Sequence, residues 1–317
     1  MKKTISILLA LMLVLGLGAA ASAENGQSFD AALSDNAVTI TKTLTVRGEG
    51  AAYPGDTLSF TAGDGAVAEA TEGTVAPALP AIADVTVAEG DTSAEIRVVL
   101  PAFDTVGVYT YEITETDSHA AGVSYRSEAI RLVLTVIEQD GKKVVAAVHC
   151  EAEGAEKTDR FENVYSAGSL NVSKTVAGNL GDRERDFHFT VTFTAPEGQT
   201  VNSTIRYGED QTLAAGWSDT ATAEITLKHN ESLRFDNIPA GVSYTVTEAE
   251  ENQDGYTTEK SGDSGAITAE NISEAAFTNT KTVAVDTGVT LDSLPYLLIA
   301  AAAVLGLGLL TKRRLRG

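Results

Sequence analysis

The chain has 317 residues, and its 44 acidic residues outnumber its 23 basic ones, which gives a formal net charge of −21. Such an acidic surface repels nucleic acid and anionic membrane, so we exclude both as partners. The single cysteine, Cys150, excludes a disulfide within the chain.

The N-terminal residues 1–23 predict export from the cell. Two lysines precede an apolar run that ends in the small residues Ala21, Ser22 and Ala23. This order is typical of a secretory signal peptide, with cleavage expected before Glu24. The alternative is an uncleaved membrane anchor, which the Ala-x-Ala end disfavours.

The middle of the chain predicts an all-β protein. Short runs in which apolar and polar residues alternate are separated by Gly, Asp, Asn and Pro, a pattern typical of strands and turns. The clearest runs are residues 94–100, 106–115, 130–138, 143–150, 187–194, 223–229 and 242–248. Residues 62–91 are rich in alanine, glycine and acids and predict loops with one short strand. The length fits two β-sandwich domains better than one.

Three motifs occur twice in the same order. They are a lysine in an alternating strand, a glutamate that ends a Tyr-x-Ile-x-Glu or Tyr-x-Val-x-Glu strand, and an asparagine two residues after a phenylalanine. Their positions are Lys42, Glu115 and Asn163 in the first copy and Lys174, Glu248 and Asn279 in the second. This repeat predicts two domains, at residues 24–167 and 168–282.

In each motif the polar residue points to the same side as the apolar ones. Strand side chains alternate with a period of two, so Lys42 shares a face with Ile40 and Leu44. The glutamate and asparagine motifs follow the same rule. A single inward lysine is usually a snorkelling side chain. Two such lysines indicate a functional role, because burying a free ammonium costs several kcal/mol unless it is paired or neutralised.

The three residue types together allow a covalent reaction. Burial lowers the pKa of an amine and raises that of a carboxyl, so a buried pair can exist as neutral amine and neutral acid. A neutral amine is a nucleophile, and a protonated glutamate can polarise the asparagine carbonyl and shuttle protons to the leaving group. The product is an amide between lysine Nζ and asparagine Cγ, with loss of ammonia. The alternative is a buried Lys–Glu salt bridge with a bystander asparagine.

This order of motifs resembles the pilin isopeptide-linkage domains of Gram-positive sortase-assembled pili, over residues 36–281. The resemblance implies two tandem immunoglobulin-like (CnaB-like) β-sandwich domains. It also implies isopeptide crosslinks between Lys42 and Asn163 and between Lys174 and Asn279. Glu115 and Glu248 would promote the two reactions.

The C-terminal residues 283–317 resemble a cell-wall sorting signal. An apolar segment, 294–310, is predicted to form a transmembrane helix and is followed by a basic tail. In that family a sortase cuts between a threonine and a glycine, here Thr287 and Gly288. The usual Leu-Pro-x-Thr-Gly motif is replaced by Ala-Val-Asp-Thr-Gly, without the proline. The alternative is a plain single-span anchor.

The resemblance implies a backbone pilin, a structural subunit of a wall-anchored extracellular pilus. Its partners would be sortase, further pilin subunits and peptidoglycan, and Lys157 is the lysine that we predict sortase joins to Thr287 of the next subunit. The alternative is a wall-anchored adhesin or basal pilin that uses the same domains as a stalk. We expect no enzyme beyond the single-turnover crosslinking, and no cofactor or metal, because the four histidines lack ligand spacing and no catalytic motif appears.

Overall fold

The computed structural model describes residues 32–34, 36–152 and 161–283. These residues form strands and connecting turns, with no helix among them, which confirms the all-β prediction. Within these ranges there is accordingly no apolar helix of membrane-spanning length. The predicted signal peptide, 1–23, and the predicted membrane segment, 294–310, lie outside the described residues.

The first half of the molecule is a sandwich of two sheets. One sheet places β2 between β6 and the beginning of β11, with β1 and β8 beside them, and the other has the order β10-β9-β7-β3-β5 with β4 beside β7. The strands are β1 (Ala32–Ser34), β2 (Ala37–Arg47), β3 (Asp56–Ala62), β4 (Ala66–Ala70), β5 (Val85–Val87), β6 (Ser93–Val99), β7 (Gly107–Thr116), β8 (Val123–Ser124), β9 (Ile130–Gln139) and β10 (Lys142–Glu151).

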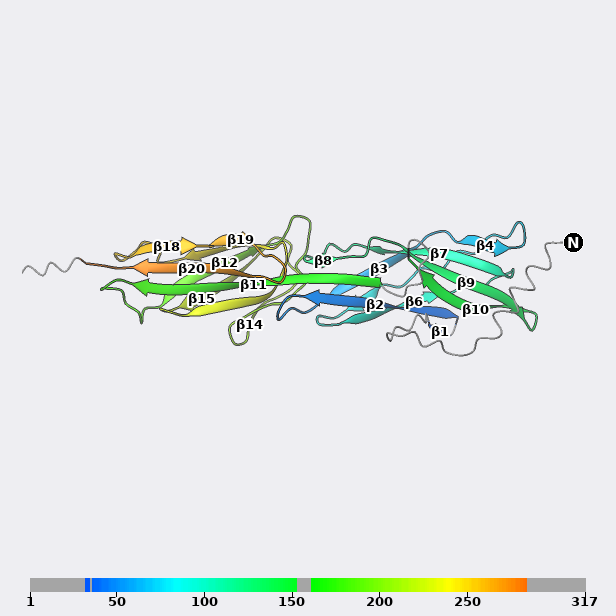
Figure 1. The fold of residues 1–317 in the computed structure, drawn as a ribbon, viewed down its shortest axis with the longest axis horizontal. Coiled ribbons are helices and arrows are strands. Elements are labelled where there is room, and N and C mark those ends of the chain that lie inside the picture. The colour runs from blue at the N-terminus through cyan, green and yellow to red at the C-terminus, as the bar shows by residue number, and fades with distance from the viewer. Residues whose placement is uncertain (1–31, 35, 153–160, 284–317) are drawn as a thin grey trace, which may run out of the picture.

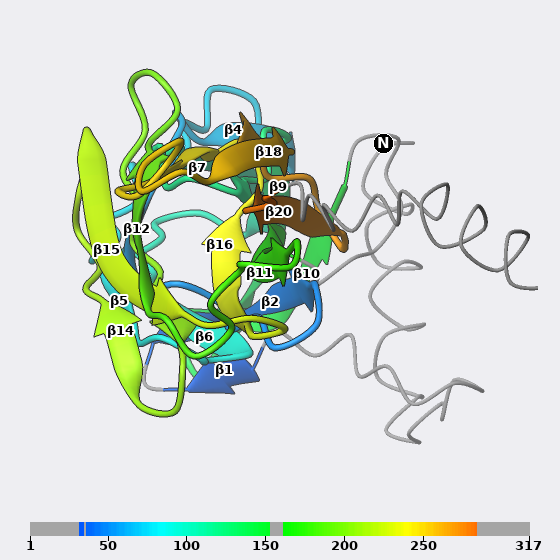
Figure 2. The ribbon, with the colours of Figure 1, turned by 90° about the vertical axis from the view of Figure 1, so that its left-hand side faces the viewer.

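The second half repeats this plan. One sheet contains β18, β20, the end of β11, β16, β13 and β14, and the other has the order β15-β12-β17-β19. Viewed down the long axis, β12 and β15 lie on one side of this half, and β16, β11 and β20 on the other (Figure 2). The strands are β11 (Phe161–Ala177), β12 (Phe187–Thr194), β13 (Ile205–Tyr207), β14 (Gln211–Leu213), β15 (Thr220–Leu227), β16 (Ser232–Pro239), β17 (Ser243–Glu248), β18 (Thr257–Ser261), β19 (Ser264–Ala266) and β20 (Ile272–Thr280).

The long strand β11 belongs to both halves (Figure 1). Its beginning, residues 161–166, pairs in parallel with β2, and its end, residues 169–177, pairs in parallel with β20. The domain boundary predicted between residues 167 and 168 therefore falls within one continuous strand. The two sandwiches lie end to end, with β1 near one end of the long axis and the end of β20 at the other (Figure 1).

Each half has its own hydrophobic core, built by the period-two pattern. In β12 the alternate residues Phe187, Phe189, Val191 and Phe193 are fully buried, and the intervening polar residues are not. Burying a side chain of this kind stabilises the fold by roughly 1.5–3 kcal/mol. The rings interlock edge to face, as at Phe189 and Phe277, whose centroids are 5.1 Å apart.

A buried asparagine joins the two halves. Asn237 of β16 has a left-handed backbone, with φ of 63°. Its Oδ1 accepts a hydrogen bond from the backbone N–H of Ala52 at 3.1 Å, and Tyr165 Oη donates to the same Oδ1 at 3.3 Å. Its Nδ2 donates to the carbonyl of Thr204 at 3.0 Å. These bonds satisfy the polar groups that the close contact buries.

Residues 62–91 contain more strand than the sequence predicted. Beyond the end of β3 they hold two short strands, β4 beside β7 and β5 beside β3, where one was expected. β5 has three residues, too few to show an alternation, and the pairing of β4 with β7 shifts register between Val67 and Glu69. Pairing with a longer neighbour, and not local sequence, makes these segments strands.

Candidate functional site

Lys42, Glu115 and Asn163 come together in the core of the first half. Lys42 lies in the middle of β2, Glu115 near the end of β7 and Asn163 near the start of β11. Lys42 and Asn163 are 0% exposed and Glu115 is 6% exposed. The strand alternation turns each side chain inward, so three polar groups share a site from which the apolar neighbours exclude water.

One carboxylate bridges the two nitrogen atoms of this site. Lys42 Nζ donates to Glu115 Oε2 at 2.6 Å, and Asn163 Nδ2 donates to Glu115 Oε1 at 2.8 Å. Lys42 Nζ also donates to Asn163 Oδ1 at 2.7 Å. The sequence hypothesis had the glutamate polarise the asparagine carbonyl, whereas the structure sets it against the amide nitrogen. Glu115 is therefore placed to move a proton between the two nitrogens.

Two further groups contact the Asn163 amide. The backbone N–H of Arg126 donates to Oδ1 at 3.1 Å, and Nδ2 also donates to Tyr53 Oη at 3.3 Å. Tyr53 is fully buried, and desolvation raises its pKa. Sequence reasoning missed both contacts. Tyr53 and Arg126 lie in loops without alternation, and a backbone donor has no residue-type signature.

Burial lowers the pKa of Lys42 below its ordinary value. The largest cause is the loss of water around the ammonium, and the hydrogen bond and charge of Glu115 oppose it. The positive charge of Arg126 lowers the pKa further. A lowered pKa favours the neutral amine, which alone has a lone pair for attack on a carbonyl carbon.

Lys174, Glu248 and Asn279 form the corresponding cluster in the second half. They lie on β11, β17 and β20, and all three are buried. Lys174 Nζ donates to both carboxylate oxygens of Glu248, at 2.9 and 2.8 Å, and Asn279 Nδ2 donates a short hydrogen bond to Glu248 Oε1. Among the described residues, Asn279 Oδ1 has no hydrogen-bond partner. The amide nitrogen again faces the carboxylate, but the carbonyl oxygen lacks the donors found at Asn163.

The pKa of Lys174 is also lowered, chiefly by desolvation, against the opposing hydrogen bond and charge of Glu248. The charge of Arg185 lowers it further. Its Nζ lies 4.2 Å from the ring centroid of Phe187. The interaction of the ammonium with such a ring offsets only part of the free energy lost when the ammonium leaves water.

The two clusters share one backbone arrangement. The lysine strand runs parallel to the asparagine strand in both, and the lysine lies opposite the phenylalanine of the Phe-x-Asn motif. The pairs are Lys42 with Phe161 and Lys174 with Phe277. Because strand side chains alternate, the asparagine two residues further on returns to the lysine's face. The same register thus repeats where the motifs repeat.

The remaining sequence candidates lie elsewhere. Cys150 is buried on β10. Within the described ranges, no group of three or more His, Cys, Asp or Glu side chains has the proximity that a metal ion needs. Lys157, Thr287 and Gly288 lie outside the described residues.

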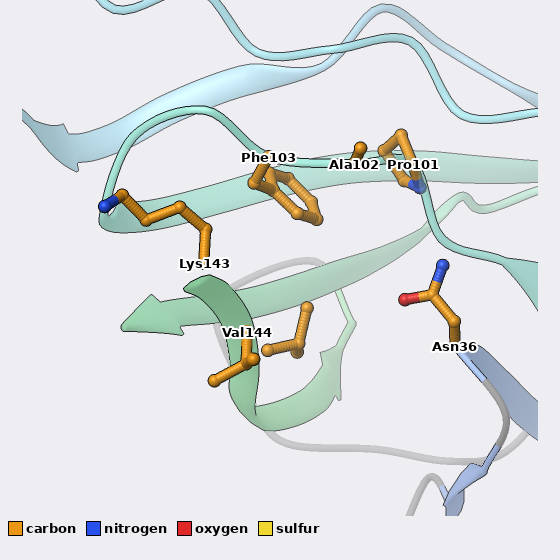
Figure 3. Close-up of a pocket in the computed structure, with 7 residues that line it drawn as sticks. Asn36, Pro101, Ala102, Phe103, Lys143 and Val144 are labelled. Atoms are coloured by element: carbon orange, nitrogen blue, oxygen red, sulfur yellow. The ribbon is translucent and has the colours of Figure 1, made fainter. Parts of the chain in front are cut away.

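A shallow hollow of about 380 Å³ lies in the first half, away from both clusters. Phe103 and Lys143 face it from one side and Asn36 from the other (Figure 3). None of the six clustered residues lines it. The candidate reactive sites lie instead at buried positions in the two cores.

Family models match both halves of the chain. Residues 38–166 match the Spy0128-like isopeptide containing domain, and residues 168–281 match a domain of unknown function (DUF7601). The first match covers β2, β7 and the start of β11, the strands that carry Lys42, Glu115 and Asn163.

Curated relatives and solved structures agree with the first match. The chain is 32% identical over 227 residues to a pilin of Streptococcus pyogenes serotype M1, an alignment that covers 64% of this chain and 66% of that pilin. It is 30% identical over 128 residues to the pilus tip adhesin Cpa of Streptococcus pyogenes, covering 39% of this chain and 18% of the adhesin.

The crystal structure of the major pilin from Streptococcus pyogenes matches with a TM-score of 0.54 at 25% identity, over 79% of this chain and all (100%) of that one. A second major pilin of that species, T3.2, shares the fold with a TM-score of 0.55 at 22% identity, over 80% of this chain and 99% of that one. The duplicated Lys-Glu-Asn clusters, the tandem sandwiches and these matches together show that the chain belongs to the family of structural pilins that contain a Spy0128-like isopeptide containing domain, here at residues 38–166.

Proposed function

We propose that this chain is the backbone subunit of a cell-surface pilus and that each of its two domains, 24–167 and 168–282, forms one internal isopeptide bond. The bonds join Lys42 to Asn163 and Lys174 to Asn279. The observation that carries this proposal is that, in both buried clusters, a single glutamate contacts the lysine nitrogen and the asparagine nitrogen together.

The reaction starts from a neutral lysine amine and a protonated glutamate, Glu115 or Glu248. The Nζ lone pair attacks asparagine Cγ, and the carbonyl electron pair moves to Oδ1. The glutamate gives its proton to Nδ2 and takes one from Nζ, so it ends protonated, as it began. The electron pair then returns from Oδ1, the Cγ–Nδ2 bond breaks, and ammonia leaves. Exclusion of water from the core protects the amide from hydrolysis.

The finer assembly steps follow from the predicted ends of the chain. After removal of residues 1–23, a sortase cuts between Thr287 and Gly288 and joins the threonine to Lys157 of the next subunit or to peptidoglycan. The segment 294–310 holds the precursor in the membrane until then. Wall extracts should contain a covalent ladder above the monomer, and a ladder that survives Lys157→Ala would assign the joining lysine elsewhere.

A stalk of an adhesin is the second candidate function, and the matches support it less. The alignment with the tip adhesin covers 18% of that protein, whereas the alignment with the pilin covers 66%. The relatives that match over most of this chain are structural proteins, in keeping with crosslinking that occurs once and without turnover.

Intact mass spectrometry of the region 24–283 tests the two bonds. We expect the folded protein to lack the mass of two ammonia molecules, Lys42→Ala and Lys174→Ala each to lack one, and the double variant to lack none. A digest should contain peptides joined between residues 42 and 163 and between 174 and 279. A folded wild-type chain of full mass would contradict the proposal.

A further inference from the structure

The two clusters differ at the asparagine carbonyl oxygen. Asn163 Oδ1 accepts hydrogen bonds from Lys42 Nζ at 2.7 Å and from the backbone N–H of Arg126 at 3.1 Å. When Nζ bonds to Cγ it ceases to act as a donor to Oδ1. The N–H of Arg126 is then the donor that remains on this oxygen.

That oxygen is where negative charge develops during the attack. A fixed backbone N–H within about 2.7–3.1 Å of such an oxygen stabilises the transition state strongly in a site without water. We propose that the backbone N–H of Arg126 is an oxyanion-stabilising group for isopeptide formation in the first domain, an inference that rests on the function proposed above. Arg126 is a catalytic residue in this sense through its main chain and not its side chain.

The loop that carries Arg126 is held on both sides of the donor. Just before it, β8 pairs with β11 at Ser124 and Val164, next to Asn163. Just after it, the Arg126 side chain folds back, and its Nε donates to the carbonyl of Glu128 at 3.1 Å. The N–H is thus aimed before the reaction begins, which is what makes a donor effective.

Contacts with the second half and with β11 hold the same loop. The backbone N–H of Ala121 donates to the carbonyl of Thr200 at 2.8 Å, and that of Ser166 donates to the carbonyl of Gly122 at 2.8 Å. Gly122 has φ of 76°, and a Cβ there would lie 2.7 Å from the Ser166 carbonyl oxygen, so glycine permits this approach. The donor is therefore positioned by the joint between the two sandwiches.

The second domain supplies an internal comparison. Its β18 lies beside β20, with Thr258 opposite Asn279, but among the described residues no group donates to Asn279 Oδ1. The proposed bond between Lys174 and Asn279 would therefore form without a donor of this kind from the described residues. Changes to the N–H at position 126 should affect one domain and spare the other.

The side chain of Arg126 has a separate effect that the test must remove. Its positive charge lowers the pKa of Lys42. Arg126→Ala removes the charge and keeps the N–H, whereas Arg126→Pro removes both. The informative comparison is between these two variants and not with the wild type.

The experiment follows ammonia loss in each domain of the full chain. The protein is synthesised without cells, quenched at intervals in acid and digested, and the fractions of joined 42–163 and 174–279 peptides are measured. Relative to Arg126→Ala, we expect Arg126→Pro to slow the first bond by about 10²–10³-fold and to leave the second unchanged. Equal rates of the first bond in the two variants would overturn the proposal.

A second pair of variants covers the case in which proline disturbs the loop. Lactic acid incorporated at position 126 replaces the N–H of the alanine variant by an ester oxygen and keeps its methyl side chain. A slower first bond in this ester than in Arg126→Ala supports the proposal, and an equal rate overturns it. Failure of the proposed function itself would look different, because Arg126→Ala and the wild type would then lose no ammonia from the first domain at all.

Discussion

Lys42 and Lys174 are long cationic side chains in cores that consist mostly of apolar residues. An ammonium in such a place destabilises the fold by several kcal/mol unless a partner compensates it, and each has one glutamate. Conversion to an amide removes the charge while keeping the aliphatic stem in the core. The reaction that we propose is therefore favoured by the burial that also makes the amine reactive.

Asn163→Ala should give the stability of the protein a pH dependence that the wild type lacks. In the variant Lys42 keeps an amine whose folded-state pKa lies below its ordinary value of 10.5. Below the folded-state pKa the ammonium is charged in both states and its burial penalty is complete. As pH rises from the folded-state pKa toward 10.5 the penalty disappears, so the variant gains stability.

In the wild type, the proposed bond makes Nζ an amide nitrogen, which does not titrate. Urea denaturation of both proteins from neutral to alkaline pH measures the effect as the change in their difference in unfolding free energy. Groups that contact neither Lys42 nor Asn163 titrate equally in the two proteins and cancel. A difference that stays constant across this range would show that Lys42 does not titrate in the variant.

Sequence reasoning at the residue scale found which side chains face inward, and the structure brings all six together in two clusters. It assigned the wrong contact to the glutamates, which face the amide nitrogen and not the carbonyl oxygen. The period-two rule gives a side chain's face, but the contact between two inward groups depends on the rotamers that packing selects.

At the scale of elements, β11 connects the two sites. It carries Asn163 near its start and Lys174 near its end, so the proposed crosslinks of both domains attach to one strand. Gly168 and Ser169 in its middle resemble a linker in the sequence, and the boundary was predicted there. The strand continues because β16 and β20 pair with this segment. Such pairing joins residues far apart in the chain, so the local sequence pattern does not predict it.

Gly168→Ala should destabilise the protein at the middle of β11. A Cβ at residue 168 would lie 2.4 Å from the carbonyl oxygen of Thr268 and 2.8 Å from that of Asn271. Overpacking of this kind costs about 1–3 kcal/mol, and thermal unfolding should show the melting temperature falling by several degrees.

Gly63→Ala is the matched control. The nearest atom to its added Cβ would be the Glu112 carbonyl oxygen at 3.7 Å, an ordinary contact. We expect its melting temperature to stay close to that of the wild type. Equal melting temperatures for the two alanine variants would mean that the strand moves to accept a side chain at Gly168.

At the scale of the whole molecule, the two proposed bonds and β11 would form one covalent route along the long axis. It runs from β2 through Lys42 and Asn163 to β11, and through Lys174 and Asn279 to β20 (Figure 1). Force applied to the two ends follows this route and bypasses the other strands. By the chain-entropy account, a crosslink closing a loop of about 100 residues also stabilises its domain by about 4–5 kcal/mol.

Single-molecule pulling of the folded region tests this route, by measuring the extension that each domain releases when it unfolds under force. The wild type should show no unfolding extension. In Asn163→Ala the first domain should unfold and release its 121-residue loop, roughly 400 Å at about 3.3–3.6 Å per residue. Asn279→Ala should show one shorter event from the second domain. A long extension in the wild type would argue that the bonds do not carry the load.

The sequence by itself determined the all-β class, the duplication and the inward direction of the lysine, glutamate and asparagine, because alternation and motif order are local properties of a chain. Only the tertiary structure decided that one strand serves both sandwiches, that each glutamate contacts the amide nitrogen and that the N–H of Arg126 meets the Asn163 carbonyl. These three features depend on pairing between distant segments and on backbone atoms that nearly every residue has. The side-chain types in the sequence therefore do not predict them.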